Sequence, residues 1–262
     1  MSRIEEFELS IAPLDEDPRK IWVYLPDSYD HTKKRYDVLY MFDGHNLFFD
    51  EVATYGKSWG MKDYLDANHI DLVVVGEDCN HKGNRRMDEY CPMLDDANAE
   101  WNNEKITPQG IETAEWFVNV LKKECEKRYR VYKTRKHIGI AGSSMGGLMA
   151  CYMIAAHNDV FSKAACVSPA IYYCRKEMER LIASTEFAAT RIYMDFGSEE
   201  RKAKKDVVAL VDTMLGFSHL FGEKGCNTYP NLVVNGTHSE ASWETIVPVF
   251  LRYLYPELFQ GE

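Results

Sequence analysis

Short apolar runs alternate along most of this chain with longer segments in which apolar residues recur at helical spacing. The apolar runs predict strands at residues 37–42, 71–76, 137–141, 163–167, 191–196 and 231–234. The longer segments predict helices at residues 58–68, 111–129, 146–157, 174–187, 202–222 and 241–254. Two earlier runs, at 6–11 and 20–25, predict an antiparallel hairpin at one edge. This alternation is typical of an α/β fold with a mostly parallel sheet covered by helices on both faces.

The predicted helix at 111–129 displays the helical period most clearly. One stripe of its apolar residues is expected to face the sheet, namely Ile111, Ala114, Val118, Leu121 and Cys125. We interpret this stripe as core that carries no function.

In the segment 80–110 the apolar residues follow no helical or strand spacing, and the segment contains many polar, charged and aromatic residues. Unstructured connections of this length are uncommon in compact domains and often form lids or binding loops. The segment follows a predicted strand at the carboxyl edge of the sheet, where open α/β folds bind ligands. We therefore expect it to act as a lid or to bind substrate.

The composition suits one folded domain over residues 1–262. Hydrophobic residues make up 45% of the chain and aromatic residues 13%, which is enough to bury a sizeable core. The formal net charge of -10 argues against a nucleic acid or an anionic membrane as the main partner. No run approaches the roughly 18 apolar residues that span a bilayer. Residues 1–10 carry four charged side chains and no apolar segment, so no export signal is expected.

Seven cysteines occur along the chain, at Cys79, Cys91, Cys125, Cys151, Cys166, Cys174 and Cys226. An odd count without a Cys-x-x-Cys pair favours reduced thiols and a cytoplasmic location. A bridge between Cys79 and Cys91 is not favoured. No cluster of His, Cys and Asp has the sequence spacing of metal ligands, so neither a metal nor another cofactor is expected.

The most informative motif lies at residues 142–146, where Gly142, Ser144 and Gly146 fit the pattern G-x-S-x-G. In this nucleophile elbow a strand turns sharply into a helix and holds a serine hydroxyl at the tip of the turn. A predicted buried strand precedes the motif and a helix with few charges follows it. The alternative is a Gly-Ser turn before a core helix.

A serine nucleophile needs a base within hydrogen-bond reach. In proteins with this motif, the three catalytic residues follow one another along the chain in the order Ser, acid, His. The base must therefore come after Ser144, and two histidines lie beyond the helix that follows the elbow. His238 follows the last predicted strand in a turn-rich loop at the required edge, so it is the candidate base. His219 falls within a predicted helix and is expected at the surface.

The acid should follow the predicted strand at 191–196. Glu200 ranks first because it lies in the turn that leaves this strand, followed by Asp206, Glu199 and Asp195. Any of these carboxylates could instead be an ordinary acid at a helix N-terminus, where the helix dipole favours negative charge.

An acyl-transfer site also needs N–H donors for the oxyanion. One is the backbone amide of Met145, which follows the nucleophile. The other is expected in the loop after the strand at 37–42, where Gly44 allows close approach and the amide of His45 is the candidate donor.

Several segments together resemble the putative-esterase family of α/β-hydrolases, which includes esterase D-like, feruloyl, carbohydrate and siderophore esterases and mycolyltransferases. They read Val-Tyr-Leu-Pro at 23–26, Leu-Tyr-Met-Phe-Asp-Gly-His-Asn-Leu-Phe at 39–48, Arg-Met-Asp-Glu-Tyr-Cys-Pro at 86–92, the elbow, and Gly-Thr-His at 236–238 with Trp243 nearby. The resemblance covers nearly the whole chain.

This resemblance implies an α/β-hydrolase fold and a serine esterase without a cofactor. By position, Ser144 is the nucleophile, His238 the base, and Glu200 sits where many members have Asp or Glu. The family varies in its acyl and alcohol groups, so kinship does not name the substrate. A small-molecule ester, with a carbohydrate or another small polar alcohol, is expected, and the oligomeric state is left open.

We expect the substrate to contact Gly44, Arg85, Arg86, Glu89, Tyr90 and Trp243. The alternative for the two arginines is a surface loop in which they pair with nearby acids. An acyltransferase with the same triad and a catalytically silent binding protein remain the alternative functions.

Overall fold

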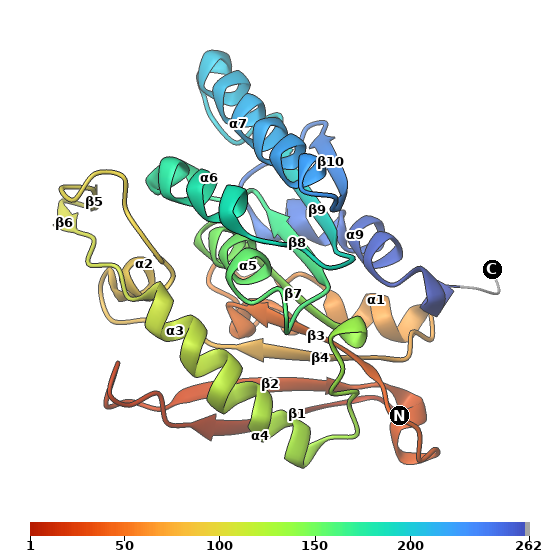
Figure 1. The fold of residues 1–262 in the computed structure, drawn as a ribbon. Coiled ribbons are helices and arrows are strands. Elements are labelled where there is room, and N and C mark those ends of the chain that lie inside the picture. The colour runs from red at the N-terminus through yellow and green to blue at the C-terminus, as the bar shows by residue number, and fades with distance from the viewer. Residues whose placement is uncertain (260–262) are drawn as a thin grey trace.

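The computed structural model describes residues 1–259, so the last three positions of the expected domain lie outside the described residues. One eight-stranded sheet has the order β1-β2-β4-β3-β7-β8-β9-β10 (Figure 1). Its strands are β1 (Arg3–Leu9), β2 (Arg19–Leu25), β3 (Asp37–Phe42), β4 (Leu72–Glu77), β7 (Ile138–Ser143), β8 (Lys163–Val167), β9 (Arg191–Gly197) and β10 (Asn227–Val233). β1 pairs with β2 and β2 with β4 in antiparallel fashion, whereas the other neighbours are parallel. The expected sheet and edge hairpin are therefore confirmed.

The helices cover both faces of this sheet (Figure 1). They are α1 (Met61–Ala67), α2 (Arg85–Glu89), α3 (Gly110–Trp116), α4 (Lys122–Arg128), α5 (Met145–Ala156), α6 (Arg175–Ser184), α7 (Lys204–Glu223), α8 (Glu240–Glu244) and α9 (Val247–Leu254). Residues of α3 to α7 belong to one buried apolar cluster, and residues of α1, α8 and α9 belong to the other. Because both faces are covered, β3 and β7 are buried along their whole length, which explains their continuous apolar runs.

The segment 80–110 is more ordered than its lack of period predicts. It contains α2 and a small hairpin of β5 (Glu100–Trp101) and β6 (Glu104–Lys105). Both elements are too short to display a period, so the expectation of an unstructured loop is wrong.

Three other expectations need correction. The helix expected at 111–129 contains a π-helical turn at Phe117–Leu121 between α3 and α4, and Ile111 is 43% exposed, outside the buried stripe. The helix expected at 241–254 divides into α8 and α9, with Pro248 in the first turn of α9, where its missing N–H costs nothing. The last strand begins at Asn227 because Pro230 is tolerated in an edge strand.

Candidate active site

A cavity of about 680 Å³ lies beyond the carboxyl ends of the central strands. Its walls come from the turn after β3, residues 54 and 55, residues 79–102, the elbow, Tyr172 after β8, and segments next to α7 and in α8. The lining residues include Asp43, His45, Asn46, Thr54, Cys79, His81, Arg86, Trp101, Ser144, Met145, Tyr172, Arg201, His238, Glu240 and Trp243. The adjacent Ser144 and Met145 therefore share one cavity with His45 and His238, which lie far from them in the sequence.

Ser144 lies between β7 and α5 in a strained backbone conformation, with φ 57° and ψ -118°. A non-glycine residue with positive φ is uncommon and is maintained only when its surroundings hold it. Here the Ser144 amide donates to the Val167 carbonyl at 3.0 Å, and its own carbonyl accepts from Leu148 and Ala170. The turn places the Ser144 side chain in the cavity wall.

The glycines of the motif permit this turn because there is no room for side chains. A Cβ at residue 142 would lie 2.5 Å from the Gly146 carbonyl oxygen, and a Cβ at residue 146 would lie 2.9 Å from the Cβ of Phe42. Both positions therefore require glycine for the close approach of α5 to β7 and β3.

His238 and Glu200 are joined by a hydrogen bond of 2.7 Å between Nδ1 and Oε2. The Glu200 side chain is almost completely buried, and its other oxygen accepts from the Gly197 amide at 2.8 Å and from the Ser168 hydroxyl. The His238 ring lies edge-on to Trp243, with centroids 5.1 Å apart. In the described residues the Ser144 hydroxyl makes no hydrogen bond to His238; such catalytic bonds often form only once substrate binds.

The other three candidate acids are engaged elsewhere. Glu199 is exposed and forms an ion pair with Lys204 at 2.6 Å, and Asp206 is exposed in the first turn of α7. Asp195 is buried in β9, where it accepts from the Ser168 amide and the Tyr193 hydroxyl. Burial raises the pKa of Asp195 to about 7.

The turn after β3 is a short 3₁₀ helix, Gly44–Asn46, preceded by Asp43 with φ 58°. The first backbone amide that donates within this turn is that of Asn46, which bonds to the Asp43 carbonyl. The amide of His45 lies one residue earlier and takes no part in the hydrogen bonds of the turn. Asn46 also reaches across the cavity, where its Nδ2 donates to Glu240 at 3.2 Å. Met145 is the first residue of α5, and amides in the first turn of a helix have no partner within the helix.

Arg86 forms a two-pronged ion pair with Asp43, with bonds of 2.6 and 2.7 Å to its two oxygens. Burial opposes both charges, but their mutual attraction and hydrogen bonds raise the pKa of Arg86 and lower the pKa of Asp43. Arg86 also lies over the ring of Tyr90. It therefore lines the cavity with one edge of its guanidinium bonded to the residue that begins the turn after β3.

Four predicted substrate contacts do not line the cavity. Arg85 is exposed, and Glu89 is buried in an ion pair of 2.9 Å with Arg19. Tyr90 is buried and donates to Glu77 at 2.7 Å. Gly44 lies against β4, where a Cβ would be 2.7 Å from the Gly76 backbone. The absence of a side chain at Gly44 therefore lets the turn pack against the sheet and does not serve a substrate contact.

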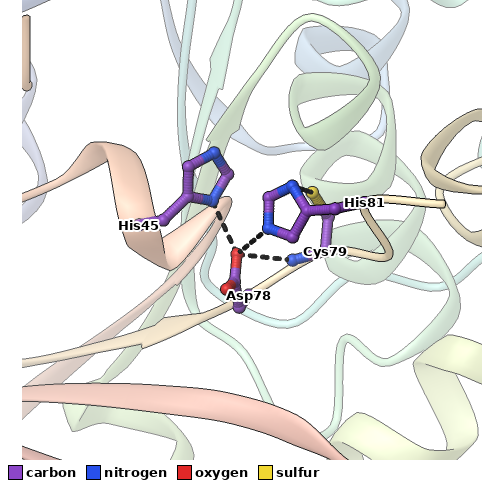
Figure 2. Close-up of side chains that lie close together, drawn as sticks. All are labelled: His45, Asp78, Cys79 and His81. Atoms are coloured by element: carbon purple, nitrogen blue, oxygen red, sulfur yellow. Dashed lines mark hydrogen bonds and ion pairs between the residues drawn. The ribbon is translucent and has the colours of Figure 1, made fainter. Parts of the chain in front are cut away.

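Sequence reasoning missed several cavity residues, including Tyr172, Arg201, Thr54 and Glu240. They occur singly in unrelated segments, so no local pattern marks them. The structure also brings together four side chains whose donor atoms could hold a metal ion, namely His45, Asp78, Cys79 and His81, of which all but Asp78 line the cavity (Figure 2). We call these four residues the His45 cluster. Spacing along the chain shows no metal-ligand motif, and the group forms only because the turn after β3 meets the residues that follow β4.

Both the sequence and the fold of this chain are similar to those of known proteins. A family model described as "Putative esterase" matches residues 14–253. The uncharacterized protein YbbA of Bacillus subtilis (strain 168) is 23% identical over 193 residues, which cover 72% of each chain. The crystal structure of an IroE-like serine hydrolase from Shewanella oneidensis is similar with a TM-score of 0.71, at 18% identity over 98% of this chain and 79% of that one. Siderophore hydrolase EstA from Aspergillus nidulans has a TM-score of 0.73, at 16% identity over 94% and 93%. These structures share the α/β-hydrolase fold.

Proposed function

The chain belongs to the putative esterase family and is a carboxylic ester hydrolase, and we propose that it works through a triad of Ser144, His238 and Glu200. The observation that carries this proposal is the hydrogen bond between the buried Glu200 and His238, whose ring lines the same cavity as the strained Ser144. A carboxylate only accepts hydrogen bonds, so Nδ1 of His238 carries the proton and Nε2 remains free to act as a base.

In the first half-reaction, His238 Nε2 takes the proton from Ser144 as the serine oxygen attacks the ester carbonyl. The carbonyl oxygen gains negative charge and accepts hydrogen bonds from the amides of Met145 and His45. Collapse of this intermediate breaks the ester bond, and the leaving alcohol takes the proton from His238. Ser144 then carries the acyl group.

In the second half-reaction, water gives its proton to His238 as it attacks the acyl-serine. The same two amides stabilise the oxyanion, and the bond to Ser144 breaks as the serine oxygen regains the proton. Glu200 holds the ring in the required tautomer and stabilises its cation. The products are a carboxylic acid and free enzyme.

The polar wall of the cavity supports a substrate with a polar group near the ester, such as a carbohydrate or another small polar alcohol. Arg201 and Tyr172 line one side, and Trp101 and Asn102 from the β5–β6 hairpin line another. Arg201 is not ion-paired to any acid in the described part of the chain, which suits a substrate with an anionic or strongly polar group. These residues replace Gly44, Arg85, Glu89 and Tyr90 as the proposed contacts.

A cytoplasmic location is part of the proposal. All seven cysteines are free and buried, which agrees with a compartment that keeps thiols reduced. None of the helices within residues 1–259 combines the length and the apolar character needed to cross a bilayer.

Labelling with a fluorophosphonate probe tests the triad. We expect one label per chain in the native protein and none in Ser144→Ala. Ser143→Ala serves as the matched control and should be labelled, because Ser143 lies within β7 beside the nucleophile. Native protein that resists the probe and leaves p-nitrophenyl acetate intact would refute the proposed nucleophile.

A further inference from the structure

The His45 cluster is assembled by the pairing of two strands. β3 and β4 are parallel neighbours, and Phe42 at the end of one lies opposite Glu77 at the end of the other. The residues that follow the two strands therefore meet at the same edge of the sheet. His45 comes from the turn after β3, while Asp78, Cys79 and His81 come from the four residues directly after β4.

The ligand atoms of the cluster converge on a small volume. One atom from each side chain can be chosen so that all four lie within 4.8 Å of one another. Asp78 Oδ1 is 2.6 Å from Nδ1 of His45 and 3.0 Å from Nε2 of His81, and the Cys79 sulfur lies 4.0 Å from the other nitrogen of His81 (Figure 2). These contacts hold the donor atoms together before any ion binds.

We propose that the His45 cluster binds a divalent transition-metal ion, of which zinc is the best match. Two imidazoles, a thiol and a carboxylate form a mixed N, S and O set in the number that tetrahedral Zn²⁺ requires. A thiolate ligand disfavours Mg²⁺ and Ca²⁺, which prefer oxygen. The side chain of His81 is 58% exposed, so it can turn to complete the coordination and leaves a path for the ion.

The hydrogen bonding around His45 suits a metal ligand. A histidine that binds a metal through one nitrogen normally donates its other N–H to a nearby oxygen. Nε2 of His45 lies 2.8 Å from the hydroxyl of Thr54, so Nδ1 can face the ion while Nε2 donates to Thr54. On binding, the thiol of Cys79 loses one proton to solvent, and the His45 proton moves from Nδ1 to Nε2. At a pH where His81 is neutral, one Zn²⁺ is thus exchanged for one H⁺.

The site adjoins the proposed oxyanion hole but does not depend on it. Coordination of the His45 side chain would anchor the turn whose backbone amide faces the ester oxygen. The ion is therefore expected to hold the 3₁₀ turn rather than to take part in the reaction.

Isothermal titration of metal-free protein with ZnCl₂ tests the site. We expect one ion per chain, and binding at least about tenfold weaker in His81→Ala, since even outer hydrogen-bond partners of metal ligands contribute this much. Titration with CoCl₂ should give a thiolate charge-transfer absorption that Cys79→Ser abolishes. The matched control is His219→Ala, which removes an exposed histidine of α7 and should bind zinc like the native protein.

Failure of the native protein to bind one zinc ion, or equal binding by native protein, His81→Ala and Cys79→Ser, would overturn the metal site. Fluorophosphonate labelling of the same zinc-free samples separates this result from the fate of the triad. If the protein is labelled but binds no zinc, the esterase proposal stands and the metal site is refuted. If it is not labelled but binds zinc at this cluster, the metal site stands and the triad is refuted.

Discussion

Glu200 and His238 are 38 residues apart in the sequence and are joined by a hydrogen bond of 2.7 Å, while the adjacent Glu199 turns outward to Lys204. The difference arises in the turn after β9. Glu200 packs inward, where its Oε1 accepts from both the Gly197 amide and the Ser168 hydroxyl and its Oε2 is bonded to His238. Two neighbouring glutamates thus have different environments, and only one can orient the imidazole.

Glu200→Gln should reduce kcat by roughly 10²–10⁴ with little change in KM. An amide can donate to Nδ1 and so favours the wrong tautomer of His238, as in other triads whose acid has been replaced. Steady-state hydrolysis of p-nitrophenyl esters measures the effect. Glu199→Gln is the control and should retain native rates; equal losses in the two variants would contradict the assignment of Glu200.

Arg86→Ala should lower the free energy of unfolding by about 3 kcal/mol, because it leaves the buried Asp43 carboxylate without its partner. Arg86→Lys should recover only part of this, since lysine cannot make the two parallel bonds. Urea unfolding measures both. Arg85→Ala, on the exposed side of α2, should change stability by no more than about 0.5 kcal/mol. Native stability in Arg86→Ala combined with a raised KM would instead favour a direct substrate contact.

Gly44→Ala should lower both stability and kcat. Its Cβ would lie 2.7 Å from the backbone of Gly76, so the turn that carries the His45 amide must move away from β4. Overpacking of this kind costs about 1–3 kcal/mol. Gly216→Ala is the control, because a Cβ there has no neighbour within 4 Å and alanine favours the helix. The prediction fails if thermal unfolding and turnover of Gly44→Ala equal those of native protein.

Asp195 makes stability depend on pH. Burial raises its pKa in the folded protein to about 7, whereas the unfolded chain loses this proton near pH 4. Between these values the folded state binds more protons, so stability falls as pH rises, by up to about 1.4 kcal/mol per pH unit. Asp195→Asn keeps the shape without the charge and should gain stability relative to native protein as pH rises from 5 to 7. Asp206→Asn should follow the native curve.

Arg201→Gln should raise KM for esters that carry a carboxylate and leave KM for neutral esters unchanged. The reason is that Arg201 lines the cavity without an acidic partner among the described residues. A pair of p-nitrophenyl esters, acetate and hemisuccinate, measures the difference. The same KM ratio in native and variant protein would exclude Arg201 as an anion contact.

The α/β class, the edge hairpin, most of the strands and the elbow motif are evident in the sequence, because each depends on local patterns. A strand buried on both faces must be apolar throughout, and the elbow needs its glycines within five residues. The helix–strand pattern failed where elements are very short, as in α2, or where a proline changes the boundary, as at Pro230 and Pro248.

What only the tertiary structure decided is which distant side chains meet. The sequence ranked Glu200 first among four carboxylates but left the other three open, and packing against Gly197 and Ser168 directs Glu200 alone toward His238. Three residues of the His45 cluster lie within positions 78–81, but the approach of His45 had no signal in the sequence, because it follows another strand whose pairing with β4 is set by a crossover through α1. Local sequence governs the backbone of each element, but convergence at a sheet edge depends on strand order, which arises only when the whole core packs.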